Sequence, residues 1–252
     1  VTDQTTTEPA LLFPADPFVR RQPDEVYAAE AAAAEQLGLF CALLDFEALV
    51  DDGDASRAIR WLPERSRPAV QTVYRGWMLR PERYDALYEA LAARGYRLVN
   101  TPAQYALTHQ LPNWYSLLAD WTPCSVWMSA DDALVAERRA MLLGDLGAGP
   151  LIVKDYVKSQ KHAWDEACFI PDAQDQTQVS RVVRRFLELQ GPDLNDGLVF
   201  RRFEAFRAIG RHARSGMPIS REYRLFMLDG EPITVSPYWE EQDDDAEAPP
   251  SV

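Results

Sequence analysis

Residues 151–164, LIVKDYVKSQKHAW, place cationic and polar side chains directly after a short apolar run. The run ends at Lys154, and the side chains that follow it are Lys158, Ser159, Lys161 and His162. A lysine at the end of a buried strand can reach phosphate oxygens, and cations aimed at such oxygens supply much of the catalysis in phosphoryl transfer. The alternative is a lysine whose stem packs while its ammonium reaches solvent. Either way, the segment is a local basic site in a chain of net charge −13.

The elements that must position this segment follow from the apolar patterns. In the first hundred residues, strands expected at 10–18, 39–46, 69–79 and 96–102 alternate with helices expected at 23–38 and 81–95. Such alternation is typical of an α/β layout with a largely parallel sheet. We therefore expect residues 1–125 to form a small Rossmann-like domain.

The second half mixes strands and helices differently, which is typical of an α+β arrangement. Two short helices are expected within 103–121, one longer helix over 130–147 with Ser129 as its N-cap, and an amphipathic helix over 177–191. Strands are expected at 124–128, 150–154 and 197–206, and a hairpin over 221–239 turns at Asp229-Gly230. Residues 126–239 then form a second domain, and 240–252 an acidic tail without order.

Composition narrows the function classes. The 252 residues are 47% hydrophobic and 26% charged, as in ordinary globular proteins. The net charge of −13 disfavours a duplex nucleic-acid partner, whose phosphates require Lys and Arg. Three widely spaced cysteines without a CxxC pair indicate reduced thiols and a cytoplasmic location. The sequence predicts neither a signal peptide nor a membrane span.

Several motifs together resemble a known family. The motifs are PLIVKDYVKSQKHAWDEA, GLVFRRF and EYRLFMLDGEPITVSPYW, preceded by FPADPF, YRGWMLRPERY, NTPAQY and LPNWY. In order and spacing they are similar to the ATP-grasp superfamily, in the clade named for two arginines and one lysine, from Leu11 to about Trp239. The resemblance implies an ATP-grasp fold, in which a Rossmann-like domain precedes two α+β subdomains that clamp ATP with Mg²⁺. It also implies a ligase that activates a small-molecule or peptide carboxylate as an acyl phosphate, accepts an amine and releases ADP and phosphate.

The resemblance assigns roles to residues of the nucleotide site. Lys154 takes the place of the phosphate-binding lysine. The loop after it lacks the usual glycines, so side chains must grip the phosphates, with Lys158 as the first candidate and a solvated loop lysine as the alternative. Arg201 matches the first named arginine, and Arg202 and Phe203 follow in the hinge that reads adenine. Strand alternation puts the two arginines on opposite faces, so one of them is structural.

Two further arginines are assigned to the reacting groups. Arg224 matches the second named arginine and is expected to meet the acyl phosphate, with a salt bridge to a neighbouring strand as the alternative. Glu222 either holds the ribose or a metal, or points outward. Arg75 follows a strand's carboxyl end, where open α/β sheets bind ligands, and is a candidate for a substrate carboxylate.

The metal ligands and the activity itself leave alternatives. The family's Mg²⁺ ligands follow the hairpin, so either the sequence is cut short or the ligands are unusual. Glu240, Glu241 and Asp243–Asp245 offer oxygens, but such a run also suits a solvated face, and no metal ligand is predicted. A non-catalytic nucleotide-binding or protein-interaction module is one rival function. A nucleotidyltransferase or nucleic-acid ligase is another, although the sequence KDYVK lacks the KxDG pattern of that chemistry. The oligomeric state is left open.

Overall fold

The computed structural model describes residues 9–65 and 69–239, so the acidic tail expected at 240–252 lies outside them. The chain forms two compact units, Val1–His109 and Gln110–Val252. The domain boundary expected near residue 125 stays a prediction. Within the described ranges, no helix is long and apolar enough to cross a bilayer.

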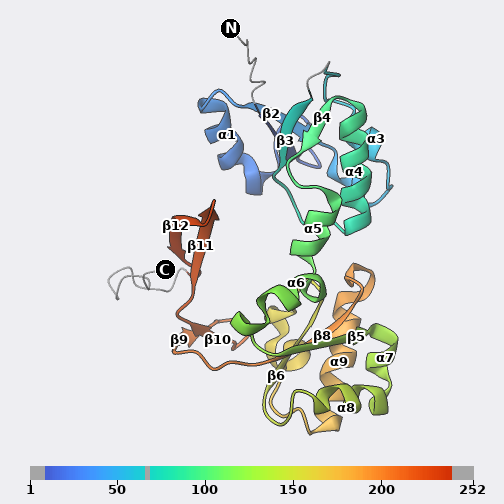
Figure 1. The fold of residues 1–252 in the computed structure, drawn as a ribbon, viewed down its shortest axis with the longest axis vertical. Helices are drawn as coiled ribbons and strands as arrows, with labels where there is room; N and C mark the ends of the chain where they lie inside the picture. Colours follow the sequence, from blue (N-terminus) through green and yellow to red (C-terminus); the bar gives the residue numbers. More distant parts are fainter. Residues whose placement is uncertain (1–8, 66–68, 240–252) are drawn as a thin grey trace. The chain divides into compact units, whose positions relative to one another are not determined.

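The first unit is built on a parallel four-stranded sheet in the order β2-β1-β3-β4 (Figure 1). Its elements are β1 (Ala10–Pro14), η1 (Glu25–Tyr27), α1 (Ala28–Gln36), β2 (Phe40–Leu44), α2 (Phe46–Val50), α3 (Ala55–Ala58), β3 (Val70–Tyr74), α4 (Pro81–Ala93), β4 (Tyr96–Leu98) and α5 (Pro102–His109). The parallel strands with intervening helices confirm the α/β, Rossmann-like layout expected for this part.

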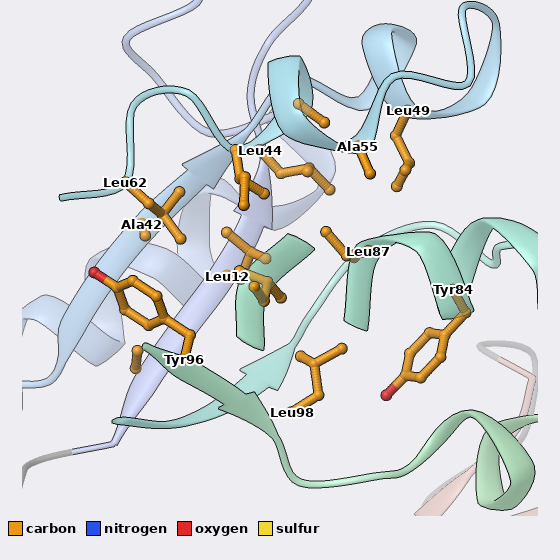
Figure 2. Packing of buried hydrophobic residues seen from close by; sticks show 14 of the residues in the cluster. Leu12, Ala42, Leu44, Leu49, Ala55, Leu62, Tyr84, Leu87, Tyr96 and Leu98 are labelled. Carbon is orange, nitrogen blue, oxygen red and sulfur yellow. The ribbon is translucent and has the colours of Figure 1, made fainter. Parts of the chain in front are cut away.

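Helices cover both faces of this sheet. On one face, Leu12 and Leu44 pack with Leu87 of α4 in a continuous apolar core, seen close up in Figure 2. On the other face, the Cys41 thiol lies 3.9 Å from the Ala31 carbonyl of α1. Figure 1 shows α1 on one side of the strands and α3 and α4 on the other. Side chains that alternate along each strand therefore reach two different helical layers.

The second unit contains an antiparallel sheet in the order β5-β8-β6-β7 and two smaller two-stranded sheets, β9-β10 and β11-β12. Its helices are α6 (Leu111–Leu118), η2 (Ala119–Trp121), α7 (Ala130–Leu134), α8 (Ala136–Gly144), η3 (Lys161–Ala163), η4 (Trp164–Cys168), α9 (Gln176–Gln190) and η5 (Gly191–Asp193). Its strands are β5 (Ser125–Ser129), β6 (Leu151–Asp155), β7 (Phe169–Ile170), β8 (Gly197–Arg202), β9 (Ala208–Arg211), β10 (Pro218–Ser220), β11 (Tyr223–Leu228) and β12 (Glu231–Pro237).

One face of the four-stranded sheet packs on α9. Val153 of β6 and Phe200 of β8 are fully buried there with Val183 of the helix. Because strand side chains alternate, the residues between these core positions must point to the opposite face of the sheet. That opposite face carries Ile152 and Lys154 of β6 and Arg201 of β8.

The second unit confirms two of the local predictions and contradicts one. The helix expected over 130–147 is wrong as a single element, because Val135 takes an extended conformation (φ −86°, ψ 112°) that separates α7 from α8. The Ser129 cap is confirmed, since its hydroxyl accepts a hydrogen bond from the Asp132 amide at 3.1 Å. The Asp-Gly hairpin turn is confirmed too, with φ of 52° at Asp229 and 87° at Gly230.

Candidate functional site

The pairing of β6 with β8 decides which of the predicted basic residues lie together. Lys154 pairs with Val199, and Ile152 pairs with Arg201. Directly opposed residues of an antiparallel pair share a face, and so do residues two apart along one strand. Lys154 and Arg201 therefore lie on the same face, the one away from α9.

Arg202 lies on the other face of the sheet. Its Nε donates a 2.8 Å hydrogen bond to the carbonyl oxygen of Leu146, just beyond the end of α8. An arginine that satisfies a carbonyl left free at a helix end has a structural role in holding that end. The structure thus brings Arg201, and not Arg202, to the side of Lys154.

Both cations on the shared face are partly removed from water. The pKa of Lys154 is lowered to about 8, chiefly by burial; the charge of Asp155 opposes the shift, and that of Arg201 contributes to it. Burial also lowers the pKa of Arg201. The Lys154 ammonium donates to the Asp155 carbonyl oxygen at 2.8 Å, and the Arg201 guanidinium donates to the Thr122 hydroxyl at 2.5 Å.

Neither cation has a carboxylate partner in the part of the chain that the structure describes. A half-buried cation bonded only to neutral oxygens is costly, because its lost hydration is not replaced by an opposite charge. Two such cations on one face form a site that an anion would stabilise.

Aromatic side chains adjoin these cations. The Trp164 ring stacks on Phe169 at a centroid distance of 5.2 Å, and Phe203 meets both rings edge-on at 5.8 and 5.2 Å. Phe169 pairs with Ile152 across β6 and β7, so this cluster shares the face of Lys154. An aromatic cluster beside cations suits a ligand with an aromatic ring at one end and phosphate at the other.

The Cys168 thiol lies beneath this cluster. Burial raises its pKa to about 12, and the positive charges of Lys161 and Lys154 oppose that shift. Because both lysines influence the same buried thiol, the loop after β6 stays close to the strand from which it emerges. A thiol with a raised pKa is a poor nucleophile, so Cys168 has a packing role here.

The loop of residues 156–163 carries the other predicted cations. The Lys158 side chain is exposed, and its backbone carbonyl accepts a 2.9 Å hydrogen bond from the Asp155 amide. The Lys161 ammonium lies 5.6 Å from the Tyr238 ring centre. The His162 ring lies edge-on to His212 at 6.3 Å, and Ser159 is half-buried. Of these, Lys158 keeps its charged group in solvent next to the site.

Lysine usage is a signal that the motif comparison overlooked. The chain contains three lysines, and they are Lys154, Lys158 and Lys161. Every arginine-rich helix and strand elsewhere does without lysine. Lysine presents a compact, mobile point charge to a phosphate, whereas arginine favours fixed planar pairs. Its restriction to eight consecutive residues therefore marks the segment independently of any family pattern.

Asp155 is a residue of the site that the sequence did not lead us to predict. It is fully buried, and its Oδ1 accepts hydrogen bonds from the Val157 amide at 2.7 Å and from the Lys158 amide. Its Oδ2 accepts from Gln190 Nε2 at 3.1 Å and from the amide and side chain of Asn195 at 3.1 and 2.8 Å. A polar residue at the end of an otherwise apolar strand was the available signal.

Arg224 lies on the β11–β12 hairpin. Its guanidinium lies 4.9 Å from the centre of the Tyr238 ring, and Lys161 approaches the same ring from the loop. Glu222, just before β11, accepts a 3.3 Å hydrogen bond from the Trp239 indole. One tyrosine thus connects the second predicted arginine with the lysine-bearing loop through cation–π contacts.

Arg75 belongs to the first unit and already has a carboxylate partner. Its guanidinium forms a two-pronged pair with Glu30, at 2.5 and 2.9 Å. This hydrogen bond holds the pKa of Glu30 below its ordinary value. A substrate carboxylate would have to displace Glu30, so the substrate role of Arg75 stays a prediction.

Metal ligands do not assemble within residues 9–65 and 69–239. No group of three His, Cys, Asp or Glu side chains there is placed to hold a metal ion. The oxygens offered by Glu240, Glu241 and Asp243–Asp245 lie outside the described residues. No Mg²⁺ ligand is therefore assigned among the described residues.

Comparison with known proteins is consistent with this arrangement. Residues 143–252 match the family model for the ATP-grasp domain, family 3 of the clade named for two arginines and one lysine. This segment, which is less than half of the chain, is therefore similar to an ATP-grasp domain of that clade. The matched segment includes Lys154, Arg201, Phe203 and Arg224, so the resemblance found in the motifs is confirmed for the part of the chain from residue 143 onward.

Solved structures and curated proteins add the following. A RimK domain ATP-grasp protein from Sphaerobacter thermophilus is 17% identical, with a TM-score of 0.45, 79% of this chain covered and 65% of that one. The D-cycloserine synthetase DcsG is 15% identical, with a TM-score of 0.48, 77% of this chain covered and 59% of that one. D-alanyl-alanine synthetase A from Vibrio cholerae is 12% identical, with a TM-score of 0.46, 91% of this chain covered and 66% of that one. The chain spans less than two thirds of the length of each of these proteins. No curated protein matches the sequence of the chain.

Proposed function

We propose that this protein is an ATP-dependent ligase that joins a carboxylate to an amine through an acyl phosphate. The observation that supports this most is the pair of half-buried cations, Lys154 and Arg201, on one sheet face of an ATP-grasp domain. They have no carboxylate partner among the described residues, and an aromatic surface adjoins them. The triphosphate of ATP would supply the missing negative charge, and the adenine would lie against the aromatic cluster that includes Phe203.

The proposed chemistry has two steps. A carboxylate oxygen of the first substrate attacks the γ-phosphorus of ATP, the bond to the β-phosphate oxygen breaks, and ADP leaves. The amine of the second substrate then attacks the acyl carbon, loses a proton and expels phosphate. Lys154, Lys158 and Arg201 would hold the phosphates, and Arg224 would meet the negative charge that develops on the acyl phosphate.

Mg²⁺ is part of this proposal as the partner of the nucleotide. It would neutralise charge on the β- and γ-phosphates when bound. The three free cysteines support a reducing, cytoplasmic location, which we include in the proposal. The amine and carboxylate are small molecules or peptides.

The test uses hydroxylamine as a general amine. The chain is incubated with ATP, Mg²⁺, hydroxylamine and a panel of amino acids, dicarboxylates and short peptides, and ADP and hydroxamate are measured. Hydroxamate formed in step with ADP supports the ligase. AMP attached to a lysine would show the nucleotidyltransferase instead. ATP binding without either product across the panel would favour the non-catalytic module.

A further inference from the structure

The loop after Lys154 has a fixed shape for which a single carboxylate is responsible. Asp155 is fully buried and accepts hydrogen bonds from five N–H groups, with no cation among them. Two donors are the amides of Val157 and Lys158, within the loop itself. The others come from Gln190, at the end of α9, and Asn195, in the connection to β8. One side chain therefore ties three chain segments together.

Backbone amides in such a loop usually serve a different purpose. Successive N–H groups that converge on one point form a concave anion site, and glycine-rich phosphate loops use it to hold a nucleotide phosphate. Here the amides of Val157 and Lys158 converge on the protein's own carboxylate. The anion that occupies their concavity is Asp155, so these two amides are not available to a phosphate.

The hydrogen-bond network around Asp155 also includes Gln160 of the loop. Gln190 donates to Asp155 through Nε2 and also to the Asp193 carbonyl, both at 3.1 Å, while its Oε1 accepts from Gln160 at 2.6 Å. The loop is therefore held at Val157, Lys158 and Gln160. The side chain of Lys158 leaves this framework toward solvent.

We propose that Asp155 is a positioning residue that fixes the loop of residues 156–160 before nucleotide arrives, so that side chains rather than backbone amides hold the phosphates. This inference rests on the proposed function. It explains how the loop keeps its shape without glycine. In a glycine-rich loop the backbone amides converge on a phosphate of the ligand, whereas here they converge on the carboxylate of Asp155. Lys154 and Lys158, at the two ends of the Asp155 turn, are then held at a constant separation.

The sign of one mutational effect separates this role from simple electrostatics. A negative charge close to bound triphosphate repels it, so removing that charge should by itself strengthen ATP binding. A positioning role predicts the opposite, because the loop loses its shape and must be ordered when ATP binds. Asp155→Asn removes the charge and turns one acceptor into a donor that the five N–H groups cannot use. Asp193→Asn is the matched control, because Asp193 is exposed nearby and joins the network through its backbone carbonyl.

Two measurements on the full chain decide the matter. Amide hydrogen exchange at Val157 and Lys158 without nucleotide should be at least about tenfold faster in Asp155→Asn and unchanged in Asp193→Asn. The ATP dissociation constant should rise about tenfold or more in Asp155→Asn and stay the same or fall in the control. If Asp155→Asn does not fold, Asn195→Ala removes one of the five donors and should shift both values in the same direction by less.

The contrary outcomes are distinct. Asp155→Asn with parental exchange and parental or tighter ATP binding would overturn the inference, even if its melting temperature falls. Faster exchange with unchanged ATP affinity would also overturn it, since loop shape would then not matter for the nucleotide. A parent protein that binds no ATP would instead overturn the proposed function, and the nucleotide role of Asp155 with it, while the exchange data would still decide whether Asp155 fixes the loop.

Discussion

Lys154 and Arg201 share one face of the β5-β8-β6-β7 sheet because β6 and β8 are paired so that Ile152 lies opposite Arg201. The pairing places two cations side by side that are far apart in the sequence. Neither has a carboxylate partner in residues 9–65 and 69–239. The relationship between these two residues leads directly to several measurable consequences.

Replacing Lys154 should affect binding more than stability. Lys154→Met keeps the aliphatic packing and removes the charge, so ATP binding should weaken by about 1.5–3 kcal/mol, the range for a hydrogen bond to a charged group. The melting temperature without nucleotide should not fall, because Lys154 forms no salt bridge within the described residues and its buried charge is costly. Calorimetric titration and thermal unfolding measure the two effects. A large drop in melting temperature with unchanged ATP affinity would show that Lys154 is structural.

The lowered pKa of Lys154 makes stability depend on pH. Its value of about 8 in the folded protein lies below the ordinary 10.5, so the unfolded chain holds a proton that the folded protein releases between pH 8 and 10.5. Stability contributed by this group therefore rises with pH across that window, and below pH 8 the full penalty of the buried charge remains. Lys154→Met lacks this rise. The difference in melting temperature between the variant and the parent should shrink from pH 8 to pH 10.5.

ATP affinity should change with pH in the opposite sense. Phosphate binds the protonated form of Lys154 more tightly than the neutral form. The dissociation constant of the parent for ATP should therefore increase as the pH rises through about 8, the pKa of Lys154 in the protein without nucleotide. The same titration from pH 7 to 9.5 on Lys154→Met should be flatter. Equal slopes in the two proteins would assign the titration to another group.

Arg201 and Arg202 form a matched pair of neighbours on opposite faces. Arg201→Met should weaken ATP binding or turnover on the order of tenfold or more, because it removes a charged donor from the phosphate side. Arg202→Met should leave both unchanged and cost about 0.5–1.5 kcal/mol of unfolding free energy, because the Leu146 carbonyl loses its donor. If Arg202→Met weakened ATP binding and Arg201→Met only lowered stability, then Arg202, and not Arg201, would face the nucleotide in the functional protein.

Arg224 is expected to act on the reaction rather than on ground-state binding. Arg224→Met keeps much of the side-chain volume, so ATP affinity should stay within a few-fold of the parent while turnover falls on the order of 10²-fold. Single-turnover ADP formation with a carboxylate found by the hydroxamate screen measures this. Tyr238→Phe is a useful companion, since it keeps the ring that Arg224 and Lys161 contact. If Arg224→Met turned over at close to the parental rate, Arg224 would have no role in activating the carboxylate.

The elements that could be predicted from sequence are those with strong local signals. The Asp-Gly turn, the Ser129 cap and the buried strand ending at Lys154–Asp155 all depend on residues next to one another. Strand alternation also predicted that Arg201 and Arg202 face opposite ways, and the separate hydrogen bonds to Thr122 and Leu146 confirm it. Which arginine faces Lys154 depends on strand register, a long-range property that periodicity does not encode.

The remaining features depend on partners far along the chain. The break falls at Val135, a β-branched residue with good helix formers on both sides, and a single residue of lower propensity does not predict where a helix ends. The role of Asp155 depends on Gln190 and Asn195, which approach it only after α9 has packed on the sheet. The family motif drew attention to the lysines, while the buried carboxylate between them was marked only by its place at the end of a largely apolar strand.

The confinement of lysine to residues 154–161 makes this chain unusual for covalent chemistry. Within these 252 residues, every lysine amine lies in or beside the candidate site. An amine-selective reagent therefore modifies no side chain outside this segment, and the mass of the labelled peptide that contains it reports how accessible the site is. For the same reason, attaching the protein to a surface through its amines would anchor it by this loop and block the face that a ligand needs.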